Sequence, residues 1–446
     1  MKIKKYYLNI LILFSIMITG CAGPSVYQVE LIPSPHVYSE GLVNPFPKED
    51  PRKTVLPYTG ILYVTDRQPA DMRHEEVYYR NKRGYELRLG KGEIELDRLS
   101  LAIKHEMSWE EAVAISKQKV RNQSYPLQVR NFQEYGFLTS TKVLPTKDQL
   151  NSKSYHQAEN EYAELINKKL AISKKKDIYI YVHGYRTIFE DPLLVGATFW
   201  HYMGYDGVFI AYAWPSTPRT FAYLADLDTA TMTSRNLRLF LKYLSEKTKV
   251  ENIHIIGYSM GTRVVTYTLQ DISLMFQNKT EKEIHKKYPI GNVWLIGSDL
   301  ERGVFASYLI DGLLRVPKTL TVYASDKDSA VGTSRWLFER NRIGESWGEN
   351  KPSKRFIDFM KKNGNIYFVD VTEAEDATTG NGHHYFTESP WVSSDLLLSM
   401  LYNLTPEQRG LVFNEEEYTW RFSKDYNENV SVAIQKVDPV IRGITK

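Results

Sequence analysis

The strongest fold signal in this chain of 446 residues is the stretch Ile253-His-Ile-Ile-Gly-Tyr-Ser-Met-Gly261. The apolar run Ile253–Ile256 predicts a buried strand, and Thr262–Leu269 behind the stretch predicts a helix. Ser259 lies between them, in a sharp turn where a Cβ on either side would clash. Gly257 and Gly261 therefore fit a nucleophile elbow, which lifts the serine hydroxyl clear of the sheet.

Short apolar runs rich in β-branched residues recur along the chain, with helical patterns between several of them. The runs are Ile178–Val182, Val208–Tyr212, Ile253–Ile256, Val293–Ile296, Leu320–Tyr323 and Ile366–Val369. The clearest helical pattern covers Thr229–Lys247. This alternation predicts a mostly parallel sheet with helices on both faces. Together with the serine elbow it predicts an α/β-hydrolase fold, with its core over residues 171–402.

Two further sections flank this core. Residues 58–170 predict a β-rich N-terminal extension, with strand patterns at Gly60–Thr65, Glu76–Tyr79 and Tyr85–Leu89 and a helix near 155–170. Residues 403–446 form a C-terminal extension whose first feature is a helix start at Thr405-Pro-Glu407. The sequence assigns no function to this last section.

The N-terminus predicts a secretory signal peptide over residues 1–20. A basic start is followed by the apolar stretch Leu8–Ile18, which is short for a membrane span. Ile18-Thr-Gly-Cys21 resembles the lipobox of bacterial lipoproteins. This resemblance implies acylation of Cys21, the only cysteine, so an intrachain disulfide is excluded. Ala22 in place of an aspartate then favours the periplasmic face of the outer membrane, where the cell has one.

A proline-rich tether is predicted over residues 21–57. Seven of the 19 prolines of the chain lie there, at positions 24, 33, 35, 45, 47, 51 and 57. The whole composition, 42% hydrophobic and 25% charged, is that of a globular protein. A net charge of +4 gives no indication of nucleic-acid binding. Oligomeric state is not determined by these features.

A serine nucleophile needs an acid and a base, which in this fold follow the serine along the chain. Asp326 and Asp328 follow the run Leu320–Tyr323, and Asp299 follows the preceding run, so three acids qualify. After the last run a glycine-rich loop ends in His383 and His384, and either imidazole could serve as the base.

An oxyanion hole is predicted from two backbone amides, those of Met260 and Tyr185. Met260 follows the nucleophile, and Tyr185 follows the strand Ile178–Val182. His183, before the glycine of the same loop, is predicted to be structural. No metal-ligand spacing appears around His383 and His384, so neither a metal nor an organic cofactor is expected.

The chain resembles the bacterial α/β-hydrolase family of unknown function called DUF900. The stretches that carry the resemblance are Ile61–Arg67, Tyr181–Tyr185 with Phe189-Glu190, Ala213–Ser216, His254–Arg263, Tyr323–Asp328, and Gly382–Phe386 with Asp395. In the family pattern the acid lies three residues after the serine of a Tyr-x-Ser segment, and the histidine directly follows a glycine. The resemblance therefore implies Asp328 rather than Asp326, and His383 rather than His384.

These features together predict a lipid-anchored envelope serine hydrolase that acts on carboxylic esters of small molecules or lipids. Ser259 would form an acyl-enzyme with His383 as base and Asp328 as its partner. Two alternatives share the same sequence features. One is a binding or scaffolding lipoprotein on a hydrolase fold, since fold does not fix function. The other is an acyltransferase, and neither the substrate nor the acyl-chain preference follows from the sequence.

Overall fold

The computed structural model describes residues 29–51, 60–71, 78–96, 107–142, 156–219, 222–338, 340–348 and 351–437. The predicted signal peptide and Cys21 lie outside these ranges. Within them, no helix has both the length and the apolar character needed to cross a bilayer.

One 11-stranded sheet organises the molecule, in the order β10-β11-β9-β8-β7-β6-β4-β5-β1-β2-β3. Strands β4 to β9 are mutually parallel and coincide with the six apolar runs, which confirms the predicted fold class. Strands β2, β3 and β10 run antiparallel to their neighbours. The strands are β1 (Gly60–Pro69), β2 (Tyr79–Leu96), β3 (Leu127–Phe137), β4 (Asp177–Val182), β5 (Val208–Tyr212), β6 (Asn252–Tyr258), β7 (Ile290–Ile296), β8 (Thr319–Ala324), β9 (Ile366–Asp370), β10 (Val412–Asn414) and β11 (Thr419–Arg421).

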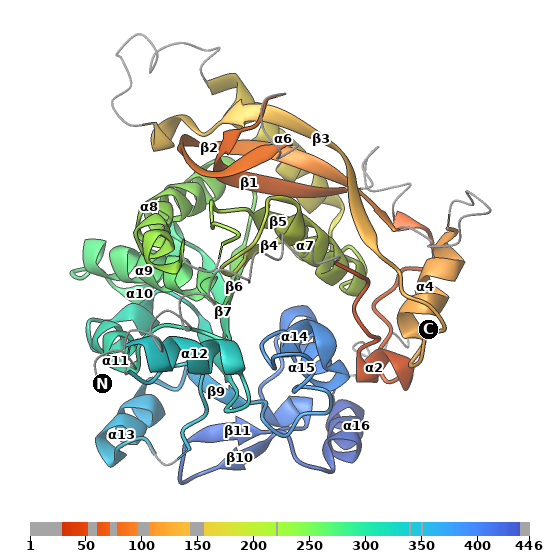
Figure 1. The fold of residues 1–446 in the computed structure, drawn as a ribbon, viewed down its shortest axis with the longest axis vertical. Helices are drawn as coiled ribbons and strands as arrows, with labels where there is room; N and C mark the ends of the chain where they lie inside the picture. The colour runs from red at the N-terminus through yellow and green to blue at the C-terminus, as the bar shows by residue number, and fades with distance from the viewer. Residues whose placement is uncertain are drawn as a thin grey trace, which may run out of the picture.

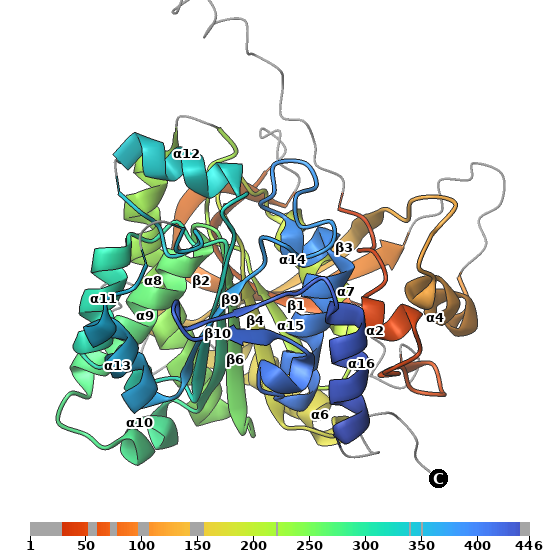
Figure 2. The ribbon, with the colours of Figure 1, turned by 90° about the horizontal axis from the view of Figure 1, so that it is seen from below.

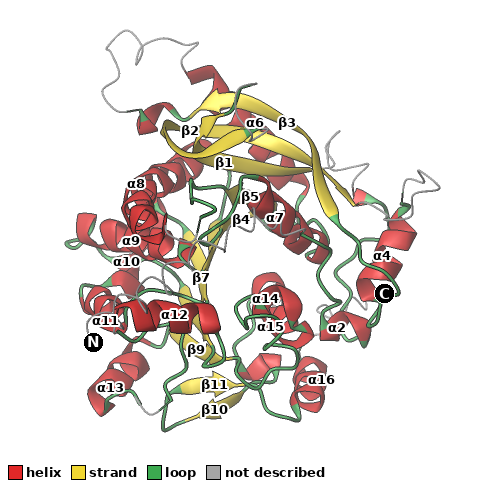
Figure 3. Cartoon of the chain, viewed as in Figure 1, coloured by secondary structure: helices red, strands yellow, loops and turns green. Residues whose placement is uncertain are grey.

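Helices cover both faces of the sheet: α8, α9 and α10 lie on one side, and α7, α14 and α15 on the other (Figures 1 and 3). The helices are α2 (His36–Ser39), α4 (Trp109–Lys117), α6 (Gln157–Ile172), α7 (Glu190–Tyr202), α8 (Tyr223–Lys247), α9 (Gly261–Met275), α10 (Glu281–Lys287), α11 (Arg302–Ile310), α12 (Ser329–Phe338), α13 (Lys354–Asn363), α14 (Tyr385–Glu388), α15 (Pro390–Tyr402) and α16 (Tyr426–Lys436). The pattern Thr229–Lys247 corresponds to α8, which begins earlier, at Tyr223. Its N-cap residue, Ala222, makes no side-chain cap, so the sequence carries no start signal there.

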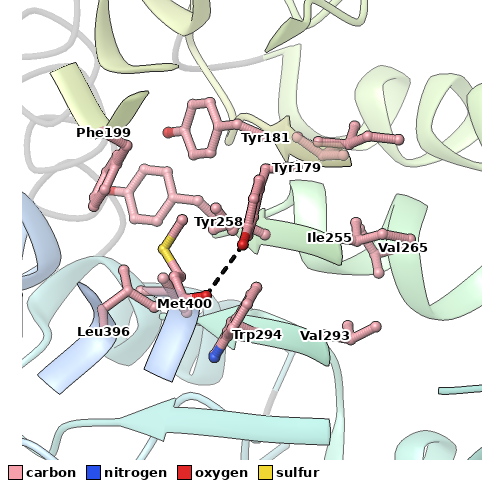
Figure 4. Close-up of a cluster of buried hydrophobic side chains, with 14 of the residues drawn as sticks. Tyr179, Tyr181, Phe199, Ile255, Tyr258, Val265, Val293, Trp294, Leu396 and Met400 are labelled. Atoms are coloured by element: carbon pink, nitrogen blue, oxygen red, sulfur yellow. Dashed lines mark hydrogen bonds between the residues drawn. The ribbon is translucent and has the colours of Figure 1, made fainter. Parts of the chain in front are cut away.

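The central strands send alternate side chains to the two faces, and both sets are buried (Figure 4). Tyr179, Tyr258 and Trp294 point toward α7 and α15, whereas Ile255 points toward α9. The Tyr179 hydroxyl donates a 3.1 Å hydrogen bond to the carbonyl oxygen of Met400 in α15. Strands buried on both faces read as continuous apolar runs, which explains why the sequence located them well.

The described part of the predicted proline-rich tether, residues 29–51, packs against the body, which corrects the prediction of a spacer there. Val37, Tyr38 and Val43 are buried, and the Tyr38 hydroxyl donates a 2.7 Å hydrogen bond to the carbonyl oxygen of Tyr202 in α7. The apolar residues between the prolines bury their side chains, and this gain outweighs the extended preference of the proline backbone.

The N-terminal section belongs to the same sheet as the core, because β1 pairs in parallel with β5. The sequence predicted two separate strands here, at Glu76–Tyr79 and Tyr85–Leu89, and this separation is wrong. One long strand, β2 (Tyr79–Leu96), contains Tyr79 and the whole of Tyr85–Leu89, and it pairs antiparallel with β1 through register shifts near Arg67. Such irregularities bend the strand without ending it.

The C-terminal section extends the opposite edge of the sheet, because β11 pairs in parallel with β9. The helix predicted to start at Thr405 is only a 3₁₀ turn, Glu407–Arg409. Arg409 is buried and its Nε donates a 2.6 Å hydrogen bond to Asp395 Oδ1. The other oxygen of Asp395 accepts a 2.6 Å hydrogen bond from Tyr323, so a buried ion pair fixes this section to the core.

Candidate active site

Ser259 forms the turn between β6 and α9. Its φ of 52° lies in the left-handed region that a serine rarely adopts. Its N–H donates a 2.8 Å hydrogen bond to the Ile296 carbonyl oxygen, and its own carbonyl oxygen accepts one of 3.0 Å from the Thr262 N–H. Both neighbouring elements therefore hold the strained backbone, as expected for a functional elbow.

Glycines surround this turn because the neighbouring chain comes very close. A Cβ at Gly261 would collide with the backbone carbonyl oxygens of Val182 and His183, and one at Gly257 would lie 3.0 Å from Val265. A Cβ at Gly184, in the loop after β4, would lie only 2.7 Å from the Ser259 Cβ. All three positions therefore require or strongly favour glycine.

The hydroxyl of Ser259 lies beside Gly184, since a Cβ there would be 3.3 Å from the Ser259 Oγ. The Ser259 side chain is partly exposed. Among the described residues the Ser259 Oγ has no hydrogen-bond partner, so the structure does not join Ser259 to a histidine directly. Serine–histidine hydrogen bonds are often loose without substrate and tighten when it binds.

His383 and Asp328 form a buried pair at the same end of the sheet. His383 Nδ1 lies 2.6 Å from Asp328 Oδ2, across 55 residues of sequence. Asp328 Oδ1 accepts hydrogen bonds from the N–H groups of Ala330, at 3.1 Å, and Val331, at 3.0 Å. The carboxylate is thereby fixed from both sides, and its contact orients the imidazole with Nε2 away from it. Figure 2 shows α12 and α14, which follow the two loops, at one end of the sheet.

Two glycines allow the histidine loop to reach the acid loop. At Gly382, with φ of 67°, a Cβ would lie 2.5 Å from the Lys327 carbonyl oxygen. At Gly297, with φ of 55°, a Cβ would lie 3.0 Å from His383 Cε1. Gly297 was not among the residues predicted for the site, although a glycine directly after the strand ending in Ile296 is a visible signal.

The imidazole of His383 packs beside the elbow. Its ring centroid lies 4.9 Å from that of Tyr258, the residue before Ser259. The Tyr258 ring and Gly297 thus both lie close to His383. Ser259, His383 and Asp328 therefore gather around the carboxyl ends of β6, β7 and β8, where sites lie in open α/β sheets.

The two alternative acids have other surroundings. Asp326 is exposed, and the carboxylate beside His383 Nδ1 is that of Asp328. Asp299 forms an ion pair with Arg263, at 2.9 Å from the guanidinium Nε, and also accepts a hydrogen bond from the Tyr223 hydroxyl. This ion pair connects the nucleophile helix to the loop after β7, a link that sequence reasoning missed.

The alternative base, His384, has a different hydrogen-bond partner from His383. Its Nδ1 lies 3.2 Å from the Tyr258 hydroxyl. Burial, followed by the nearby His383, lowers the pKa of His384 to about 4, so its imidazole is neutral at physiological pH. The candidate acid Asp328 therefore pairs with His383.

The two amides predicted for an oxyanion hole belong to the residue after Ser259 and to the residue after Gly184, which adjoins Ser259. Met260 is the N-cap residue of α9, and within the described chain its N–H makes no hydrogen bond. Tyr185 follows Gly184, whose backbone adjoins the Ser259 side chain. His183 is buried against Trp214, with ring centroids 5.3 Å apart, and its Nδ1 lies 2.7 Å from the Gly184 carbonyl oxygen.

Among the described residues, no group of three His, Cys, Asp or Glu side chains could hold a metal ion.

A comparison with curated proteins finds no match. A comparison with protein families matches residues 158–400 to the family described as "Alpha/beta hydrolase of unknown function". That match covers the elbow and both loops of the site and more than half of the sequence. The chain therefore belongs to the DUF900 family of α/β hydrolases.

Proposed function

We propose that this protein is a serine hydrolase that cleaves carboxylic esters through an acyl-enzyme. The observation that carries the proposal is the 2.6 Å contact between His383 Nδ1 and Asp328 Oδ2 beside a serine in a strained elbow. A carboxylate on Nδ1 keeps Nε2 unprotonated, and that nitrogen can then accept the serine proton.

In this mechanism Ser259 attacks the ester carbonyl while His383 takes its proton. The carbonyl oxygen becomes an oxyanion, which the N–H groups of Met260 and Tyr185 stabilise. His383 then returns the proton to the alkoxide leaving group, and the acyl group stays on Ser259. Water, activated by the same imidazole, attacks the acyl-enzyme and releases the carboxylic acid. Asp328 holds the imidazole in one tautomer throughout.

The test combines 4-nitrophenyl esters of several chain lengths with a fluorophosphonate probe that labels activated serines. The wild type is expected to hydrolyse at least one ester and to take up one probe per chain. Ser259→Ala is expected to lose both properties, whereas Ser307→Ala, at an exposed serine of α11, keeps them. Full labelling of Ser259→Ala would exclude the proposed nucleophile.

The same site could pass the acyl group to an alcohol or an amine, because the steps up to the acyl-enzyme are identical. Product analysis with added alcohols and amines distinguishes transfer from hydrolysis. If the wild type takes up no probe but specifically retains an envelope component, that result favours a binding lipoprotein over an enzyme.

We also propose that Cys21 is acylated and anchors the protein in the cell envelope, on the periplasmic face of the outer membrane where one exists. The lipobox-like stretch Ile18–Cys21 supports this. The test is metabolic labelling with a palmitate analogue and membrane fractionation. Cys21→Ser is expected to lose the label and leave the membrane fraction, and a labelled Cys21→Ser protein would contradict the anchor.

A further inference from the structure

Arg67, near the end of β1, reaches a loop beside the nucleophile. The side chain is fully buried, and its Nη2 donates a 2.7 Å hydrogen bond to the carbonyl oxygen of Thr187. Its Nη1 donates to Asn81 on β2. An arginine is seldom buried without a specific purpose, because removing its charge from water is costly.

Carboxylates around Arg67 offset part of this cost. Burial lowers the pKa of Arg67 to about 10, while Glu190, Asp66, Asp191 and Asp226 act in the opposite direction. The guanidinium therefore remains charged at neutral pH. A charged donor makes a stronger hydrogen bond to a carbonyl oxygen than a neutral one.

The residues beside Arg67 fasten the same region. The Thr65 hydroxyl donates a 2.6 Å hydrogen bond to the Ala213 carbonyl oxygen, in the loop after β5. Asp66 accepts hydrogen bonds from Thr233, at 2.9 Å, and Asn236, at 3.0 Å, both on α8. Three consecutive buried residues of β1 thus connect the N-terminal strands to loops and a helix of the core.

Thr187 is held from several directions. Its N–H donates a 3.1 Å hydrogen bond to the Ser216 Oγ, and that hydroxyl donates a 3.0 Å bond back to the Thr187 carbonyl oxygen. The preceding residue, Arg186, has a φ of 60°. A non-glycine residue keeps such a conformation only when its surroundings enforce it, and Arg67 with Ser216 supplies that constraint.

The constraint extends to the peptide that carries the Tyr185 N–H. The carbonyl oxygen of Gly184 accepts a 3.2 Å hydrogen bond from the Thr187 hydroxyl and lies 2.7 Å from His183 Nδ1. In a trans peptide the carbonyl and the following N–H point in opposite directions. Fixing the Gly184 oxygen therefore also fixes the direction of the Tyr185 N–H.

We infer that Arg67 is a positioning residue for the oxyanion hole, acting through Thr187 on the Gly184–Tyr185 peptide. This inference rests on the proposed serine-hydrolase function. It gives the N-terminal antiparallel strands a role in the reaction, since β1 provides the guanidinium that holds the loop. A donor that is displaced stabilises the developing oxyanion less, whereas it affects substrate binding little.

The test uses Arg67→Lys, which keeps the charge but loses the forked geometry, and Thr187→Val, which removes only the hydroxyl contacts. Their matched controls are Arg88→Lys, at an arginine of β2 paired with Glu134, and Thr198→Val, in α7. The measurements are kcat and KM on 4-nitrophenyl butyrate and the inhibition constant of phenylboronic acid, which mimics the tetrahedral intermediate.

Both test variants are expected to lower kcat by about 10- to 100-fold and to weaken boronate binding by a similar factor. KM is expected to change by less than about threefold, and both controls to stay near the wild type. A kcat within about twofold of the wild type in folded variants, or a raised KM with unchanged kcat, overturns the inference. If Arg67→Lys fails to fold, Thr187→Val decides whether the loop that Arg67 holds sets the Gly184–Tyr185 peptide, because this variant keeps the carbonyl contact with Arg67 and loses the hydroxyl contact with Gly184. A wild type without esterase activity and without fluorophosphonate labelling would instead refute the proposed function.

Discussion

His383 and Asp328 share a 2.6 Å contact, and the same carboxylate caps the first turn of α12 through its other oxygen. One side chain therefore sets both the orientation of the imidazole and the start of a helix. The two roles of Asp328 can be separated experimentally, because an asparagine can still cap a helix but cannot hold the imidazole in the same tautomer.

Asp328→Asn is expected to lower kcat on a 4-nitrophenyl ester by roughly 10³- to 10⁴-fold, because the imidazole takes the wrong tautomer. The melting temperature should change little, since asparagine keeps the cap. Kinetics and thermal unfolding followed by circular dichroism measure the two effects. Asp326→Asn is the matched control at the exposed neighbour. A larger loss in Asp326→Asn would assign the acid to that residue.

His383→Gln is expected to remove nearly all ester hydrolysis, by roughly 10³-fold or more, because the base is lost. His384→Gln should retain activity within about tenfold, since His384 contacts the Tyr258 hydroxyl whereas Asp328 pairs with His383. Rates of fluorophosphonate labelling provide a second measurement that needs no substrate. Equal losses in the two variants would show that the pair acts together.

The buried ion pair between Arg409 and Asp395 predicts a large stability effect. Asp395→Asn leaves the Arg409 charge buried without its partner and should lower the free energy of unfolding by about 3–5 kcal/mol. Urea unfolding followed by tryptophan fluorescence measures it. Glu416→Gln, in the exposed pair with Lys351, is the control and should leave stability unchanged. A small effect of Asp395→Asn would mean that the C-terminal section contributes little to folding.

Asp191, in the first turn of α7, predicts a pH dependence of stability. Burial raises its pKa from 3.8 to about 7. The folded protein therefore holds a proton that the unfolded chain has released between about pH 4 and pH 7, so stability falls as pH rises through this window. Asp191→Asn should reduce this slope by up to about 1 kcal/mol per pH unit. Urea unfolding at several pH values measures it.

The control for this prediction is Asp228→Asn, at an exposed position of α8. It should leave the slope of stability against pH as it is in the wild type. An unchanged slope in Asp191→Asn would show that Asp191 is ionised in the folded protein, with Arg67 as the nearest explanation.

The amino-acid sequence alone was sufficient for the core strands and for the elbow at Ser259. Both depend on local rules: strands buried on two faces need continuous apolar residues, and a tight turn needs glycine beside the serine. Two predictions from the sequence were wrong where local patterns did not reflect the packing. Residues 29–51 have the prolines of a spacer but pack on α7, and α8 starts without a capping side chain.

Position after a core strand could not select among the acids, because Asp299, Asp326 and Asp328 all follow core strands, and only the family resemblance favoured Asp328. The choice depends on which carboxylate meets His383, a contact between loops 55 residues apart. The same holds for Arg67 and Thr187, which are 120 residues apart in the sequence. Arg67 lies on β1, the strand that pairs antiparallel with β2 and parallel with β5. Contacts of this kind depend on the packing of distant segments, and local sequence patterns carry no information about them.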